Sequence, residues 1–133
     1  MRTSSYFTAL VLSILMCSCA GPQPIEDELL GTWESADGAT VTLSPNGSMS
    51  ADSVPTAFFI RMIDTPVSFS GVGSWAIAQH NGKWCVDLKF TKVSFGAGSS
   101  RNSLILDHRE DSIVLFTWVA DEGGDRYELF KRK

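Results

Sequence analysis

From Leu29 onward, apolar and polar residues alternate in short runs, and each run ends at Gly, Asn, Asp or Pro. Alternation with a period of two places successive side chains on opposite faces of a β-strand, and the chain shows no long run with helical spacing. The pattern predicts about eight strands, over residues 31–35, 39–44, 48–51, 67–80, 83–93, 103–108, 112–120 and 126–132.

The clearest hairpin turns at Asn81-Gly82, a pair typical of two-residue turns between antiparallel strands. In its second arm, Asp87 and Lys89 occupy one face. The apolar residues on the opposite face are Trp84, Val86, Leu88 and Phe90. Strands spaced this regularly indicate an antiparallel meander, which either closes into a small barrel or packs as a sandwich; we expect the barrel, because closure removes exposed edges.

Two segments interrupt the alternation. Residues 55–63 favour one short helix that Pro55 could open, although Phe59-Ile60 also suits a strand. Residues 94–102 are rich in Gly and Ser and predict a loop.

The first residues follow a different pattern. Met1-Arg2 supplies a positive start, Phe7 to Met16 is an apolar stretch too short to span a bilayer as a helix, and small Ser18 precedes Cys19. These features predict a secretory signal peptide that ends before Cys19. An ordinary signal peptide cut near Ala20 is the alternative.

The chain therefore divides into a signal peptide at 1–18, a tether at 19–28 and one domain at 29–133. Loss of the signal peptide leaves about 115 residues, enough for a single core. The remaining sequence contains ten Lys and Arg residues and fifteen Asp and Glu residues, which gives a formal charge of −5. This balance argues against nucleic acid as a partner and against electrostatic attraction to anionic lipid.

Of the three cysteines, Cys17 and Cys19 lie in the leader region. Cys85 is therefore the cysteine that remains as a possible free thiol in the processed domain. No internal disulfide is expected, so the core must be large enough to be stable without a covalent cross-link. Cys85 lies between Trp84 and Val86 in a strand-like run, which favours a packed, inert thiol over a nucleophile.

The segment Met16-Cys17-Ser18-Cys19 resembles the lipobox of bacterial lipoproteins, although Met16 stands where leucine is usual. The resemblance implies cleavage before Cys19 and attachment of diacylglycerol to its sulfur, with a further fatty acid such as palmitate. It places the protein on a membrane of the cell envelope. Ala20 after Cys19 implies the outer membrane, facing the periplasm, if the host is Gram-negative.

Leu30-Gly31-Thr32-Trp33, the turn at Gly47 and the closing segment Tyr127 to Arg132 together resemble the calycin, or lipocalin-like, barrels. In that superfamily a tryptophan plugs one end of the barrel and a basic residue of the last strand lies over its ring. The resemblance implies that Trp33 is the plug and Arg132 its partner. Avidin-like barrels begin similarly, but no biotin-contacting set maps onto this chain.

The sequence offers little reactive chemistry. His80 and His108 stand next to turns and lack the spacing of a zinc site, and the acidic runs lack the oxygen spacing of a calcium loop. No serine sits in a nucleophile elbow. We expect no enzyme activity, no metal and no cofactor.

A small molecule would bind among aromatic residues, although such residues more often simply fill a small barrel. Residues 112–120 are apolar on both faces, so one face must contact the helix, a partner or a ligand. We expect the residues around a cavity to be Trp75, Trp84, Phe90 and Trp118.

These observations predict a non-enzymatic envelope lipoprotein that binds a small apolar or amphipathic molecule inside a barrel. The alternative is a protein-binding lipoprotein that acts as an inhibitor or immunity protein against a secreted enzyme or toxin. Residues 124–127, Gly-Asp-Arg-Tyr, resemble a stretch of one lysozyme-inhibitor family. In that case exposed residues of 94–102 and 121–127 would carry binding.

Overall fold

The structure is a computed structural model that describes residues 21–59, 66–96, 100–119 and 125–133. The expected signal peptide and the proposed lipidation site at Cys19 lie outside the described residues.

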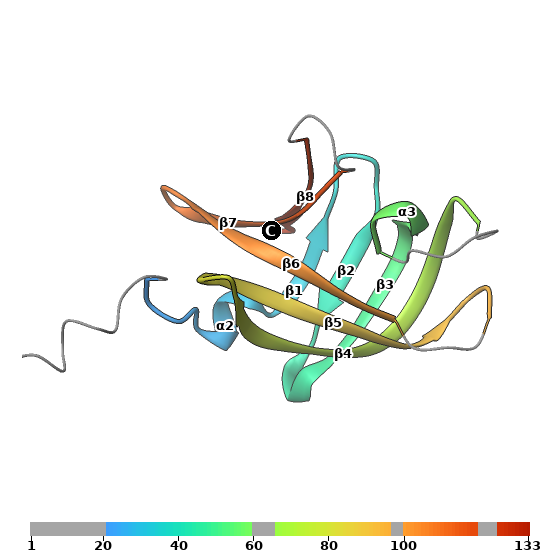
Figure 1. Cartoon of the computed structure of the whole chain (residues 1–133), viewed down its shortest axis with the longest axis horizontal. Coiled ribbons are helices and arrows are strands. Elements are labelled where there is room, and N and C mark those ends of the chain that lie inside the picture. Colours follow the sequence, from blue (N-terminus) through green and yellow to red (C-terminus); the bar gives the residue numbers. More distant parts are fainter. Residues whose placement is uncertain (1–20, 60–65, 97–99, 120–124) are drawn as a thin grey trace, which may run out of the picture.

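Eight antiparallel strands form one closed barrel, in which each strand pairs with its neighbour in sequence and β8 returns to β1 (Figure 1). The predicted fold class is thereby confirmed. The strands are β1 (Gly31–Glu34), β2 (Thr40–Leu43), β3 (Ser48–Pro55), β4 (Ser68–His80), β5 (Lys83–Val93), β6 (Ser100–Arg109), β7 (Ser112–Trp118) and β8 (Arg126–Lys131).

The two ends of the barrel differ. One end, here called the α2 end, carries helix α2 (Glu26–Leu29), the 3₁₀ turn η1 (Pro45–Gly47), the β4–β5 and β6–β7 turns and the C-terminus. The opposite end, the α3 end, carries the β1–β2 turn and helix α3 (Thr56–Phe59). Helix α3 confirms the short helix expected near 55–63, of which residues 60–63 lie outside the described residues.

Two Asn-Gly pairs make the turns that the sequence predicted. Asn81 has φ 51° and Gly82 φ 74°, and Asn46 has φ 68° and Gly47 φ 75°. Positive φ at both residues gives a turn whose twist matches that of antiparallel strands, and Asn and Gly tolerate it best. The hairpin at Asn81-Gly82 therefore pairs His80 with Lys83 as expected.

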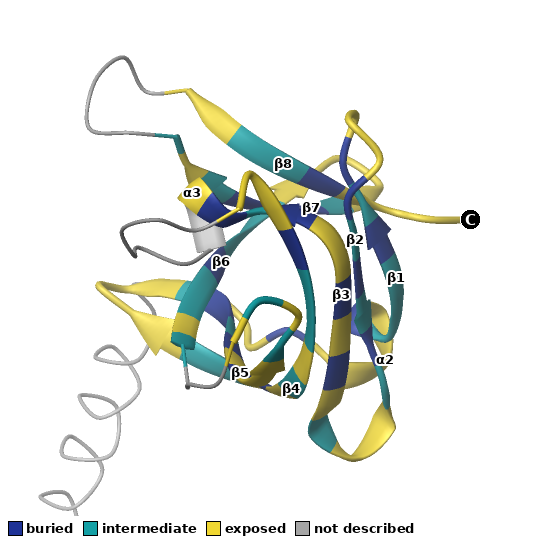
Figure 2. Ribbon diagram, turned by 90° about the vertical axis from the view of Figure 1, so that its right-hand side faces the viewer, coloured by how far each residue is buried: buried dark blue, intermediate teal, exposed yellow. Residues whose placement is uncertain are grey.

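Inward-facing residues of all eight strands pack into one core (Figure 2). The burial pattern of β3 alternates as a half-buried strand should. An eight-stranded barrel is just wide enough for side chains to fill it. The largest fully buried side chains are Trp33, Phe90, Leu29, Leu43, Leu88, Leu104, Leu115 and Leu129.

Three boundaries differ from the prediction. β3 continues to Pro55 through a register shift between Ala51 and Val54, which alternation alone does not reveal. β6 begins at Ser100, inside the expected loop 94–102, because Phe90 of β5 supplies its pairing partner. The expected tether at 19–28 includes the first three residues of α2, and the last residue of this helix, Leu29, is fully buried.

Candidate functional site

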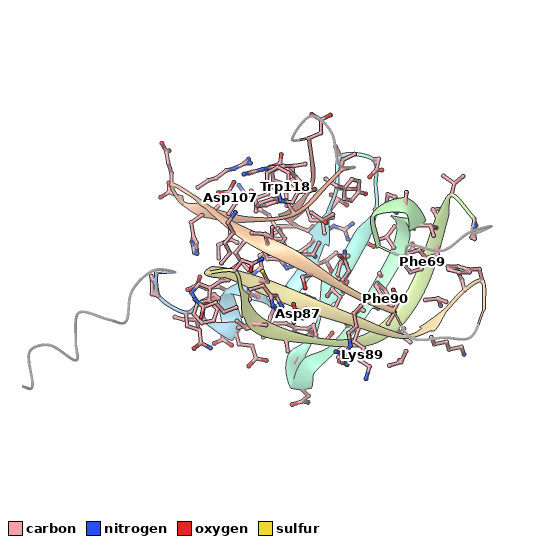
Figure 3. All side chains as sticks on the ribbon, in the orientation of Figure 1. Phe69, Asp87, Lys89, Phe90, Asp107 and Trp118 are labelled. Carbon is pink, nitrogen blue, oxygen red and sulfur yellow. The ribbon has the colours of Figure 1, made fainter. Side chains whose placement is uncertain are left out.

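Three phenylalanines form an aromatic cluster in the interior at the α3 end. The ring centroids of Phe69 and Phe90 lie 5.2 Å apart, and those of Phe69 and Phe95 lie 5.7 Å apart, both edge to face. Figure 3 marks Phe69 and Phe90 on the neighbouring strands β4 and β5. Phe69 and Phe90 are buried, whereas Phe95 is partly buried against the core and forms the accessible side of the cluster.

Glycines on β4 make room for this cluster. A Cβ on Gly71 would lie 3.0 Å from the Phe90 ring, and a Cβ on Gly73 would lie 1.8 Å from the main-chain oxygen of Lys89. The β4–β5 register shifts between Val72 and Gly73. The missing side chains thus let β5 approach closely and let the Phe90 ring lie over β4.

Among the residues that the structure describes, two buried polar atoms in the same half of the barrel have no hydrogen-bond partner: Thr56 Oγ1 and Asn102 Nδ2. Thr56 is 2% exposed, and its main-chain N–H donates to Val67 O. Asn102 pairs across the sheet with the core residue Leu88, so its side chain faces the interior. Each unpaired buried group costs about 1–3 kcal/mol, and such groups need an explanation.

A polar network ties β8 to the β1–β2 turn at this end. The hydroxyl of Tyr127 lies 2.9 Å from Ser35 Oγ and 2.8 Å from Asp37 Oδ1. Burial, and then the Asp37 carboxylate, raises the pKa of Tyr127 to about 12 against the opposing effect of Ser35. The hydrogen bond from Ser35, followed by that from Tyr127, lowers the pKa of Asp37 despite partial burial.

The structure does not gather the four aromatic residues expected around a cavity. Trp75 and Phe90 both belong to the core, and the indole of Trp75 donates to Ser44 O at 2.8 Å. Trp84 is half-buried at the α2 end. Trp118 is 46% exposed on the outer face of β7. Phe69 and Phe95 were not predicted, although Phe69 lies on the same inward face of β4 as Trp75.

Trp33 is 1% exposed at the α2 end, where its indole donates to Leu29 O. The basic residue paired with Trp33 across β1 and β8 is Lys131, whose ammonium donates to Glu28 O at 2.9 Å. Arg132, the residue expected over the Trp33 ring, forms an ion pair with Glu34.

The outer face of β6, β7 and β8 carries a second cluster, here called the outer stack: Phe116, Trp118, Arg126 and Asp107. The Arg126 guanidinium lies 4.0 Å from the Phe116 centroid and 5.2 Å from that of Trp118. Arg126 also donates to Asp107 at 2.9 Å. Figure 3 marks Asp107 and Trp118 on this side of the barrel. On the outer face of β7, the Arg126 guanidinium therefore covers the Phe116 ring, whereas Trp118 is largely exposed.

Another outer cluster joins β4, β5 and β6. His80 Nε2 lies 2.9 Å from Asp87 Oδ1, and Ser103 Oγ donates to the same oxygen at 2.6 Å. The carboxylate lies between the other two groups, so the histidine cannot take a proton from the serine as it does in a catalytic triad. No group of three His, Cys, Asp or Glu side chains that could hold a metal occurs in the described part of the chain.

Cys85 is a free, buried thiol, as predicted. Burial, followed by the charge of Asp87, raises its pKa. The thiol is therefore a poor nucleophile at neutral pH.

The described part of the barrel has several open hollows. One of about 920 Å³ lies at the α2 end, and its lining includes Trp33, His108 and Phe130. Another of about 300 Å³ lies beside the outer stack, between Trp84 and Arg126.

Within the described ranges, no helix has the length and apolar character needed to cross a membrane. Comparisons with family models, with curated proteins and with solved structures found no match to this chain.

Proposed function

We propose that this chain is a non-enzymatic, lipid-anchored protein of the cell envelope whose lipocalin-like barrel binds a small amphipathic molecule at the α3 end. The observation that carries the proposal is the aromatic cluster of Phe69, Phe90 and Phe95. It lies in the same half of the interior as Thr56 Oγ1 and Asn102 Nδ2, two polar atoms that have no partner within the described ranges. Apolar rings and unsatisfied polar groups in the same half of the interior suit a ligand that has both an apolar chain and a polar group.

The energetic argument has two parts. Each methylene that moves from water to the aromatic cluster contributes about 0.8 kcal/mol. A ligand acceptor that pairs with Asn102, or any polar group that pairs with Thr56, recovers much of the roughly 1–3 kcal/mol that each unpaired atom costs. A purely apolar ligand would recover only the first contribution.

The anchor is proposed from Cys19 and its lipobox-like context. Two or more acyl chains hold a protein firmly on a membrane, whereas one chain binds only marginally. The absence of enzyme activity is likewise proposed: the carboxylate of Asp87 lies between His80 and Ser103, and the Cys85 thiol is buried with a raised pKa.

Native mass spectrometry of the mature protein after exposure to envelope lipids tests the ligand. We expect a bound lipid, and a loss of affinity of roughly 5- to 30-fold in Asn102→Leu. Ser103→Ala is the matched control, because Ser103 is the next residue along β6 and bonds to Asp87 outside the barrel. Equal binding by Asn102→Leu and the unaltered protein, or no adduct at all, would contradict the proposal.

The outer stack supports a second candidate, a protein that binds and blocks a secreted enzyme or toxin. Trp118 is exposed, and Arg126 is held in place by two rings and Asp107. Tryptophan and arginine are enriched among the residues that dominate protein interfaces.

Affinity capture of one specific polypeptide, with identification of that polypeptide as a secreted enzyme or toxin, would favour this second function. Trp118→Ala should then weaken capture by about tenfold or more. Val72→Ala, which alters an exposed apolar residue on β4, should leave capture unchanged. Equal capture by the two variants would reject the outer stack as the interface.

A further inference from the structure

The segment that precedes β1 crosses the α2 end of the barrel. The indole of Trp84 on β5 donates to Gly21 O at 3.3 Å, and the indole of Trp33 on β1 donates to Leu29 O at 2.9 Å. β1 and β5 are four strands apart in a ring of eight, so these two bonds hold opposite ends of the segment to opposite walls. Figure 1 shows the segment running beside the β4–β5 turn toward α2.

Further contacts keep this segment in place. Pro24 is buried, and Leu29 is fully buried in the core. The ammonium of Lys131 on β8 donates to Glu28 O at 2.9 Å, near the end of α2 where main-chain carbonyls lack helical partners. The segment 21–29 is therefore part of the barrel surface and not a free linker.

We propose that the α2 end of the barrel faces the bilayer and that the α3 end faces the aqueous compartment. This inference rests on the lipid anchor at Cys19 proposed above. Cys19 precedes Gly21 by two residues, which span at most about 7 Å. A free ten-residue tether would instead allow a root-mean-square separation of about 17 Å and no fixed orientation.

Two exposed apolar side chains of the α2 end can contact a lipid surface, beside the exposed carboxylates of α2. Ile25 is 62% exposed just before α2, and Phe130 is 45% exposed beside the hollow that Lys131 also lines. Apolar and aromatic side chains with neighbouring lysines are typical of the membrane interface. The acyl chains supply the attachment, and these residues then set which end of the barrel touches the headgroups.

Site-specific fluorescence quenching tests the orientation. The full chain is produced in a bacterium that processes lipoproteins, in a Cys85→Ala background, with a fluorophore at Lys83→Cys or at Val67→Cys. Lys83 is exposed next to the β4–β5 turn at the α2 end, and Val67 is 91% exposed beside α3. Vesicles of phosphatidylethanolamine and phosphatidylglycerol carry a nitroxide on some headgroups.

We expect the label at position 83 to be quenched about twofold more than the label at 67, because position 83 lies next to the anchored segment. Trp84→Phe removes the bond to Gly21 and should reduce this difference, whereas Trp118→Phe, which alters an indole of the outer stack, should preserve it.

An intact-mass measurement of the protein distinguishes a wrong orientation from a missing lipid anchor. A lipid on Cys19 with equal quenching at both positions, or with more at 67, overturns the orientation and leaves the anchor standing. A mature chain without lipid on Cys19 overturns both the anchor and the orientation.

Discussion

Trp33 and Leu29 are joined by a hydrogen bond of 2.9 Å from the indole nitrogen to the main-chain carbonyl. Both side chains are almost completely buried, with 1% and 0% exposure. The carbonyl of Leu29 ends α2 and has no helical partner. The Trp33 side chain thus fills the α2 end of the core and also donates a hydrogen bond to the last carbonyl of helix α2.

Trp33→Phe should destabilise the protein by about 1–3 kcal/mol, because Leu29 O loses its donor in a buried site and the smaller ring leaves space. Urea unfolding measures the change. Trp118→Phe, at an exposed indole, should stay within about 0.5 kcal/mol of the unaltered protein. Equal effects of the two substitutions would show that the Trp33–Leu29 contact does not stabilise the barrel.

Stability should fall at alkaline pH because of Tyr127. Its pKa is raised from 10.0 to about 12 in the folded protein, so between these values the folded state retains a proton that the unfolded state has lost. The stabilisation is complete below pH 10 and is lost as the pH rises through about 12. In Tyr127→Phe, unfolding monitored by circular dichroism should vary less with pH across this interval; an unchanged slope would assign it to other groups.

Stability should also fall at acid pH, because of Asp37. Its folded-state pKa lies below the ordinary value of 3.8, so its contribution is present above that value and is lost as the pH falls through the lowered pKa. Asp37→Asn should flatten the acid limb of the stability curve. Asp27→Asn, at another exposed carboxylate, is the control and should leave that limb unchanged.

Gly73→Ala should destabilise the barrel by about 1–3 kcal/mol, since a Cβ there would lie 1.8 Å from Lys89 O and the main chain must shift. Gly96→Ala adds a Cβ that has no atom of the described residues within 4 Å, and it should change stability by less than about 0.5 kcal/mol. Thermal unfolding of both variants distinguishes the close approach of β4 and β5 from a general effect of replacing glycine.

Arg126→Met should cost about 1 kcal/mol, because it removes the cation from the outer stack while retaining an apolar stem over Phe116. Part of this loss should disappear at high salt, which screens the ion pair with Asp107. Unfolding at low and high salt measures both components. A loss of equal size at both salt concentrations would assign the effect to the contact of the cation with the two rings and not to the ion pair.

Local patterns were sufficient for the fold. Alternation along each strand and the Asn-Gly pairs at 46–47 and 81–82 act over two to ten residues, so the sequence alone predicted the strands, the hairpins and the closed barrel. The free, buried thiol at Cys85 was also predicted from its neighbours.

Tertiary structure decided which residues meet. Pairing of β1 with β8 places Lys131 opposite Trp33 and leaves Arg132 beside Glu34, because a shift of one residue along a strand reverses the face on which a side chain lies. Strand 112–120 is apolar on both faces, and only its register with β6 and β8 directs Trp118 outward.

The same limit applies to the candidate sites. Phe95 contacts Phe69 from 26 positions along the chain, so no local pattern marked the two rings as neighbours. Nor did a local pattern indicate that Thr56 and Asn102 lie in the same half of the barrel. Trp84 and Gly21 are 63 residues apart, yet their bond fixes the segment that follows Cys19. Local sequence determined that the chain forms a barrel. Contacts between distant segments decided which side chains meet at each end of the barrel, because closure sets the register of the strands and the register sets the face on which each side chain lies.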